Sequence, residues 1–292
     1  MKIIILVLAV LIAIITNAQQ TNLDSLIGSK ETTYIKGIVP ALATPGYEDI
    51  AYQLQSVIAD AIAYYSEKYN GIDIHAKFAV LDSINWTTEV FPYGYMYGSA
   101  GWIVMPGDID FNDFIRIYGA SSFESILLEE SAKKVINPNE ITESFFQFVA
   151  IHELGHLITS QLIKGGLQEI FLSEMVANVV AYEFLINKNP DKLKGFKLFY
   201  DVDLKNYVPH FTTMNELYEN YGKMGVDNYV WYHCSFMKLV EEIYNKKDKD
   251  FLMSVKKLCQ SNNIMEMELT EIAAYIDKDY DGIFTRWLST FK

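Results

Sequence analysis

The spacing of apolar residues predicts a long buried helix in the middle of the chain. Over residues 144–162 apolar side chains recur three and four positions apart, as on a helix that buries a wide stripe. Ser144 and Gln147 are expected to form a capping box at its start. The pair Gly165-Gly166 is expected to end it.

The same pattern predicts a helical second half and a mixed first half. A second amphipathic helix is expected after Ser173, as its N-cap, with a stop at residues 187–190. Upstream, the pattern predicts a helix around residues 47–69 and a strand through residues 72–81, whereas the chain beyond residue 190 is mainly helical. This order of elements indicates an α+β part followed by an all-α part.

Length and charge narrow the class of protein. With 292 residues and 50% hydrophobic content, one compact unit of two lobes is more natural than several independent domains. The 37 Asp and Glu residues exceed the 24 Lys and Arg residues, which argues against a nucleic-acid partner.

The first residues have the composition of a secretory signal. Lys2 precedes an apolar stretch at residues 3–15, which is too short for a typical membrane span, and small residues follow up to Ala18. We predict a signal peptide at residues 1–18 and a secreted or periplasmic mature chain that begins near Gln19, with no membrane contact after cleavage. A retained membrane anchor is the alternative.

The motif His152-Glu153-Leu154-Gly155-His156 lies inside the first predicted helix and carries the main functional signal. Positions i and i+4 are neighbours on one helix face, so both imidazoles can bind one zinc ion, and Glu153 then lies beside the open side of the metal as a general base. The alternative is a buried helix in which the two histidines are merely hydrogen-bonded.

A catalytic zinc needs a third protein ligand and one open position for water. The turns after His156 lack the glycine and third histidine of the metzincin pattern. Glu174 is a carboxylate near the start of the second helix, which is able to lie against the first. Glu169 and Glu183 are rival third ligands.

Together with the sequence around Glu174, this motif resembles the gluzincin metallopeptidases, the group that includes thermolysin and the zinc aminopeptidases. The resemblance implies zinc ligands His152, His156 and Glu174. It also implies a residue four positions after Glu174, usually Asp, that supports the first histidine. Asn178 stands there, and an amide is a weaker hydrogen-bond acceptor than a carboxylate.

The resemblance also implies a fold and a substrate site. The expected fold is zincin-like: a small mixed β-sheet with a backing helix in residues 19–140, and a mainly helical lobe with the zinc helix in residues 141–292. The active cleft is expected between the two lobes. The aromatic and glycine-rich residues 92–98, followed by a strand signal at 101–106, are a candidate for the edge strand that binds an extended peptide. A plain hairpin with exposed tyrosines explains these residues equally well.

A candidate oxyanion donor comes from the segment that begins at Tyr229. It is similar to a gluzincin aminopeptidase helix that begins with Tyr and carries apolar residues seven and ten places later, here Phe236 and Leu239. Tyr229 is therefore the first candidate to stabilise the oxyanion, with Tyr232 and His233 as alternatives. Aromatic residues at helical spacing also commonly pack the core, and this interpretation stays open.

These features indicate a secreted zinc-dependent metallopeptidase that acts on peptides or proteins, with Zn2+ as its cofactor. The exopeptidase motif of the aminopeptidases, Gly-X-Met-Glu-Asn, is absent from the sequence, which disfavours an aminopeptidase. The alternative is a secreted binding protein that keeps the zincin fold without catalysis.

Some other residues have several interpretations. Cys234 and Cys259 would be able to pair in an oxidising compartment or remain free thiols. Residues 277–282 resemble the opening of a calcium-binding loop, but Leu288 stands where such a loop needs Glu, and a solvated turn explains them as well. His75, in a predicted strand, and His210 are expected to be structural.

Overall fold

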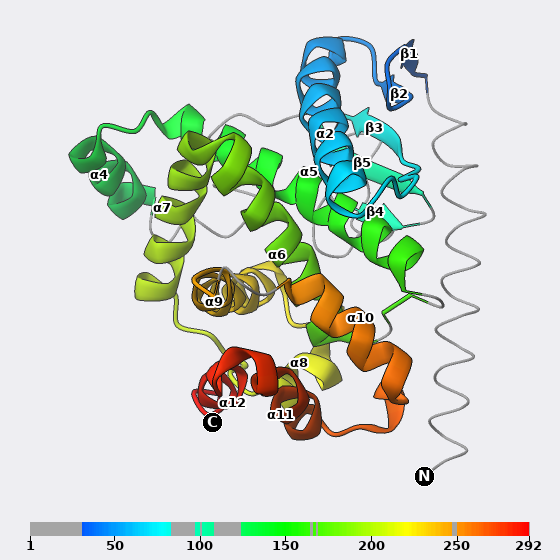
Figure 1. Ribbon diagram of the computed structural model, residues 1–292. Helices are drawn as coiled ribbons and strands as arrows, with labels where there is room; N and C mark the ends of the chain where they lie inside the picture. The colour runs from blue at the N-terminus through cyan, green and yellow to red at the C-terminus, as the bar shows by residue number, and fades with distance from the viewer. Residues whose placement is uncertain are drawn as a thin grey trace.

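The computed structural model describes residues 31–82, 97–99, 101–107, 124–163, 166–167, 169–246 and 250–291. Within these ranges the chain is an α+β protein that is mostly helical and has one small mixed sheet (Figure 1). The predicted signal peptide at residues 1–18, the tyrosine-rich residues 92–96 and Gly165 lie outside the described residues.

The sheet combines a parallel centre with antiparallel edges. Its strands are β1 (Thr33–Ile35), β2 (Ala41–Ala43), β3 (Lys77–Leu81), β4 (Tyr97–Ser99) and β5 (Trp102–Pro106), in the order β1-β2-β3-β5-β4. Strands β2, β3 and β5 are parallel, while β1 and β4 pair antiparallel at the two edges.

The predicted strand at residues 72–81 is shorter than expected. It begins at Lys77 because its partner β5 begins at Trp102, opposite Lys77. The expectation that His75 lies in a strand was therefore wrong. His75 precedes β3 and is largely exposed, with Nε2 3.0 Å from Asp73.

The helix predicted at residues 47–69 is present and packs against strands β1, β2 and β3. Helix α2 (Glu48–Lys68) buries Ala51, Leu54, Ile58, Ala61 and Tyr65, which are spaced three and four residues apart along one face. The Tyr65 hydroxyl donates to the carbonyl oxygen of Val180 at 2.6 Å and so links this helix to the helical part of the molecule.

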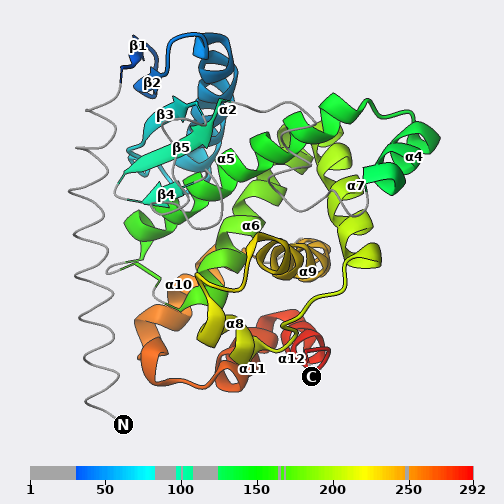
Figure 2. The same ribbon diagram turned by 180° about the vertical axis from the view of Figure 1, so that it is seen from behind.

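The remaining helices pack around one long central helix. They are α4 (Glu124–Lys134), α5 (Pro138–Leu162), α6 (Ile170–Lys188), α7 (Pro190–Asn206), α8 (Met214–Asn220), α9 (Val226–Tyr244), α10 (Phe251–Ser261), α11 (Leu269–Tyr280) and α12 (Ile283–Leu288), with a short 3-10 turn at Ile264–Glu266. Helix α5 contacts the sheet and α2 on one side and α6 and α7 on the other (Figure 2). It therefore connects the mixed part of the fold to the helical part.

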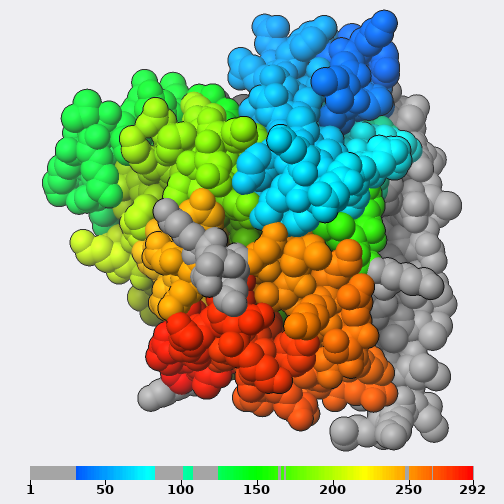
Figure 3. Space-filling view, viewed as in Figure 1, coloured from blue at the N-terminus to red at the C-terminus, as the bar shows by residue number. Residues whose placement is uncertain are grey.

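The C-terminal helices reach back to the backing helix of the sheet. Lys68, the last residue of α2, lies 2.6 Å from Glu183 of α6 and 3.0 Å from Asp250, which caps α10. Figure 3 shows α2 and α10 side by side on one face of the molecule. These ion pairs connect the end of α2 to α6 and to the start of α10.

Both predicted helix starts were wrong. Helix α5 begins two turns earlier than expected, because Asn137 caps it and Pro138 occupies its first turn. Ser144 is therefore inside the helix, where its hydroxyl donates to the carbonyl oxygen of Glu140. Helix α6 begins at Ile170 and is capped by Glu169, so Ser173 lies in its first turns and is not the cap.

Helix α6 ends at Lys188, inside the predicted stop at residues 187–190. Within the described residues it is also the one helix long and apolar enough to cross a membrane. However, 67% of its apolar window is buried inside the fold. It also carries Glu174 and Asn178 among its buried residues. Its apolar character is that of a core helix.

The C-terminal helices bear on two alternatives that the sequence left open, the pairing of the two cysteines and the structure of residues 277–282. Cys234 and Cys259 are both free thiols, so they do not pair. Asp277 lies in α11, where its two carboxylate oxygens accept from the backbone N–H groups of Phe284 and Thr285 at 2.8 and 2.9 Å. The turn interpretation of residues 277–282 is therefore correct only for residues 281–282, which form a left-handed turn between α11 and α12, because residues 277–280 belong to α11.

One buried acid in the helical part is poorly compensated. Asp203 of α7 is 3% exposed, and its Oδ2 atom has no hydrogen-bond partner. Burial raises the pKa of Asp203 to about 7; a hydrogen bond with Cys234 lowers it, and the charge of Asp227 raises it further. The folded state therefore favours the neutral carboxylic acid.

The raised pKa of Asp203 predicts that the stability of the protein depends on pH. Because its folded pKa is above its unfolded pKa, its contribution is fully present below about pH 4 and is lost as pH rises to about 7, a change on the order of 4 kcal/mol. Asp203→Asn should remove this change, as measured by urea unfolding at pH 5 and pH 8 in excess chelator.

Asp201 provides a matched control on the same helix. It pairs with Lys238 and Lys197, and although burial raises its pKa, these partners hold it below the ordinary value. Because a carboxyl with a lowered pKa titrates below this pH range, Asp201→Asn should leave the change in stability between pH 5 and pH 8 as it is in the natural protein. An unchanged pH dependence in Asp203→Asn would contradict the assignment.

Candidate metal centre

Helices α5 and α6 approach each other unusually closely beside the His152-Glu153-Leu154-Gly155-His156 motif. A β-carbon at Gly155 would lie 2.8 Å from the α-carbon and 3.2 Å from the carbonyl oxygen of Ala177. No other residue type fits there without moving a helix backbone. This contact brings the motif against the turn of α6 that carries Glu174 and Asn178.

The close approach brings three of the predicted residues together. The Nε2 atoms of His152 and His156 are 3.2 Å apart, and Glu174 Oε2 lies 3.2 and 3.6 Å from them. Ligands of a tetrahedral zinc ion with bonds of about 2.0 to 2.1 Å are about 3.3 to 3.4 Å apart. The spacing of these atoms therefore suits one metal ion, and two imidazoles with a carboxylate are a donor set that zinc accepts.

The two rival carboxylates have other partners. Glu169 caps α6 through the backbone N–H groups of Phe171 and Leu172, and it accepts from the Tyr218 hydroxyl. Glu183 pairs with Lys68 and accepts from Tyr64 at 2.9 Å. Neither belongs to the cluster formed by His152, His156 and Glu174.

The hydrogen bond between His152 and Asn178 directs the lone pair of the neutral His152 ring toward the cluster. His152 Nδ1 donates to Asn178 Oδ1 at 2.9 Å, and His156 Nδ1 lies 3.2 Å from Ser173 Oγ. A neutral imidazole protonated at Nδ1 has its lone pair at Nε2. His152 is thus held in the tautomer that a metal ligand requires, whereas the Ser173 hydroxyl is able to donate or to accept and does not by itself fix the tautomer of His156.

Without a cation, this arrangement is electrostatically unfavourable. Two nitrogen lone pairs and a carboxylate oxygen face one another, and Glu174 Oε2 is buried with no hydrogen-bond partner. Burial lowers the pKa of His156, but the Glu174 carboxylate outweighs this effect and raises it to about 9. In the metal-free protein a proton on His156 therefore supplies the positive charge.

The same interactions act on Glu174 and Glu153. Burial raises the pKa of Glu174, but the neighbouring histidines, His156 first, hold it well below its ordinary value. The half-buried Glu153 has a raised pKa because burial outweighs the opposing effect of the two motif histidines. Glu174 thus stays ionised as a ligand should, while Glu153 takes up a proton more readily than an ordinary carboxylate.

Helix α9 brings two of its three candidate donors to the cluster. His233 Nε2 lies 3.7 Å from Glu174 Oε2, and the Tyr229 and His233 rings are 4.3 Å apart. Burial keeps Tyr229 protonated by raising its pKa well above 10. Burial also lowers the pKa of His233 to about 4, so this imidazole is neutral at pH 7. Both are able to donate a hydrogen bond.

The third candidate on α9 packs the core. The Tyr232 side chain is fully buried and its hydroxyl donates to the carbonyl oxygen of Thr213 at 2.7 Å. The helix also begins at Val226, so Tyr229 lies in its first turn and is not its first residue.

Sequence reasoning missed one residue at the cluster and gave another the wrong role. Tyr221, at the end of α8, donates to Glu174 Oε1 at 3.3 Å. No spacing in the sequence marks it, because it meets Glu174 through the packing of separate helices. Ser173, expected to cap α6, instead contacts His156.

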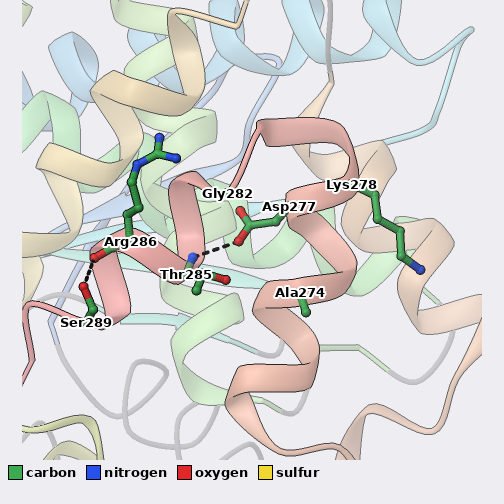
Figure 4. Close-up of a pocket in the computed structure, with 7 residues that line it drawn as sticks. All are labelled: Ala274, Asp277, Lys278, Gly282, Thr285, Arg286 and Ser289. Atoms are coloured by element: carbon green, nitrogen blue, oxygen red, sulfur yellow. Dashed lines mark hydrogen bonds between the residues drawn. The ribbon is translucent and has the colours of Figure 1, made fainter.

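A separate surface hollow lies between α11 and α12 and has no part in this cluster. Figure 4 shows its lining side chains, which include Asp277, Lys278 and Arg286. The Asp277 carboxylate is engaged by the backbone of α12. The hollow contains none of the residues of the candidate metal centre.

The contact of Gly155 with Ala177 predicts that replacing this glycine lowers stability, although the same substitution inside a helix ordinarily raises it. Gly→Ala inside a helix ordinarily stabilises by about 0.5 to 1 kcal/mol. Gly155→Ala should instead destabilise by about 1 to 3 kcal/mol and weaken zinc binding, because the new methyl group meets backbone atoms of Ala177.

A double variant tests whether the loss of stability comes from contact with the backbone of residue 177. Gly155→Ala with Ala177→Gly should recover little stability, since the α-carbon and carbonyl oxygen of residue 177 remain in the way. Chemical unfolding and a zinc-chelator competition measure both effects. A stabilised Gly155→Ala protein with unchanged zinc affinity would contradict the contact.

The hydrogen bond between His152 and Asn178 predicts how substitutions of Asn178 change the zinc affinity. Asn178→Ala should weaken zinc binding by about 10- to 100-fold, because it frees the His152 ring. Asn178→Asp should bind zinc at least as tightly as the natural protein, since a carboxylate is the better acceptor and removes the buried, unpaired Nδ2 group. Equal affinities in all three proteins would exclude a role for residue 178.

Comparison with known proteins identifies no relative. No family model, no curated protein and no solved structure matches this chain. The functional interpretation therefore depends on the residues of this chain and on their geometry.

Proposed function

We propose that this protein is a zinc-dependent metallopeptidase with a zincin-like fold and a gluzincin ligand set. The convergence of His152 Nε2, His156 Nε2 and Glu174 Oε2 within 3.2 to 3.6 Å carries this proposal. Three protein ligands leave one position of a tetrahedral ion open, which is typical of catalytic zinc and not of structural zinc.

The neighbouring residues support hydrolysis. When bound, zinc polarises a carbonyl group and lowers the pKa of water from 15.7 to about 7. Glu153 accepts the proton of the attacking water and returns it to the departing amine, a role that its raised pKa favours. Tyr229 or His233 donates a hydrogen bond to the developing oxyanion.

The position of β4 supports an extended peptide as substrate. β4 forms one edge of the sheet, pairs with β5 on one side, and contacts α5, the helix that carries the motif. An extended peptide binds such an edge as an additional strand, through main-chain hydrogen bonds. The proposed cleft lies between this edge and the helical part, and the signal sequence makes the proposed location secreted or periplasmic.

One observation favours a second candidate function, a secreted binding protein that keeps the fold without catalysis. Asn178 stands in the position where the resemblance implies a carboxylate, and its Nδ2 group is buried without a partner. A weaker partner for His152 is expected where zinc no longer has to support turnover.

The experiment that separates these candidates is Glu153→Gln. We expect one zinc per chain in both proteins, and a loss of peptide cleavage of about 100- to 10,000-fold in the variant. Glu143→Gln is the matched control, because Glu143 lies on the same helix but pairs with Lys192. Zinc content and cleavage of a mixed peptide library are measured for each.

The outcomes distinguish the two functions. A Glu153→Gln protein that cleaves as fast as the natural one refutes the assignment of the general base. Zinc without cleavage in the natural protein and in both variants favours the binding protein.

A further inference from the structure

The turn between α8 and α9 places a tyrosine beside the metal centre. Tyr221 follows the last residue of α8, and the chain then passes Gly222 and Gly225, whose φ angles of 88° and 84° suit glycine. The start of α8 is fixed by a capping box between Thr213 and Glu216. A short helix with a fixed start thus leads directly to Tyr221.

The hydroxyl group of Tyr221 takes part in two hydrogen bonds whose directions can be assigned. Tyr221 donates its hydroxyl proton to Oε1 of Glu174, 3.3 Å away. Tyr221 is then left with its lone pairs as acceptors. The hydrogen bond between Tyr229 and Tyr221 therefore has Tyr229 as the donor.

The bond from Tyr221 gives the two carboxylate oxygens of Glu174 different surroundings. Oε1 is held by Tyr221, whereas Oε2 faces the Nε2 atoms of His152 and His156 and has no hydrogen-bond partner. A carboxylate is able to bind a metal through one oxygen or both. A hydrogen bond to one oxygen favours binding through the other.

We propose that Tyr221 is a positioning residue that holds Glu174 as a one-oxygen metal ligand and holds the Tyr229 hydroxyl beside the metal. This role rests on the proposed function, because it assumes that the cluster binds zinc. Tyr221 acts through Glu174 and Tyr229 and does not itself contact the reacting atoms. During reaction Tyr229 exchanges its hydrogen bond to Tyr221 for one to the oxyanion.

The test is Tyr221→Phe, which removes only the hydroxyl group. The Tyr221 side chain is partly exposed, so the aromatic ring should still pack, and thermal unfolding in excess chelator checks this. Zinc affinity, measured by competition with a chelator, should fall by about tenfold. A loss of about tenfold is the lower end of the range expected when a hydrogen-bond partner of a metal ligand is removed. We expect the lower end because the hydrogen bond from Tyr221 to Glu174 is long.

Tyr64→Phe is the matched control. Tyr64 also donates to a glutamate of α6, Glu183, but that glutamate is outside the cluster. Tyr64→Phe should leave zinc affinity unchanged. If both variants weaken zinc binding equally, the effect is a general loss of packing around α6 and the proposal is overturned.

A spectroscopic measurement adds a readout of ligand geometry. With Co2+ in place of zinc, Tyr221→Phe should show weaker visible absorption, because a carboxylate that binds through both oxygens raises the coordination number. An unchanged spectrum with unchanged zinc affinity overturns the proposal. These readouts do not depend on cleavage. A natural protein that binds zinc but cuts no peptide would end the peptidase proposal while leaving the role of Tyr221 to be judged by affinity and spectrum.

Discussion

The contact between Gly155 and Ala177 is the constraint on which the candidate metal centre depends. A single β-carbon at position 155 would meet the backbone of the facing helix at 2.8 Å, so the two helix axes are as close as the chain allows. At this distance the side chain of Glu174 reaches both motif histidines, and Asn178 accepts a hydrogen bond from the Nδ1 side of the His152 ring. A wider separation would break every one of these contacts together.

The rest of the fold holds this pair of helices in place. Helix α5 packs against the sheet, α2 and α7, while α6 is bound to α2 through Tyr65 and Lys68. The centre is therefore enclosed by elements from both halves of the chain. Burial makes the mutual repulsion of the three proposed ligand atoms large unless a cation neutralises it, and although burial itself lowers the pKa of His156, the Glu174 carboxylate raises it.

The sequence allowed prediction of those features that depend on local spacing. The histidines one turn apart, the backing helix at residues 47–69 and Glu174 on a second helix all follow from periodicities along one segment. The helix starts were wrong because Asn137 and Glu169 compete with other polar residues that have similar capping ability. Tyr221 was missed and Tyr232 was given a possible role that it does not have, because only the packing of α8 and α9 decides which ring meets Glu174.

The measurement that tests the central claim most directly is zinc X-ray absorption spectroscopy on the purified natural protein. Our account predicts one zinc with two imidazole nitrogens and two oxygen ligands, one from Glu174 and one from water, at about 2.0 to 2.2 Å. Failure to bind zinc in a one-to-one ratio would contradict it. So would a shell of three imidazoles and a carboxylate, which would make His233 a ligand and leave no position open for water.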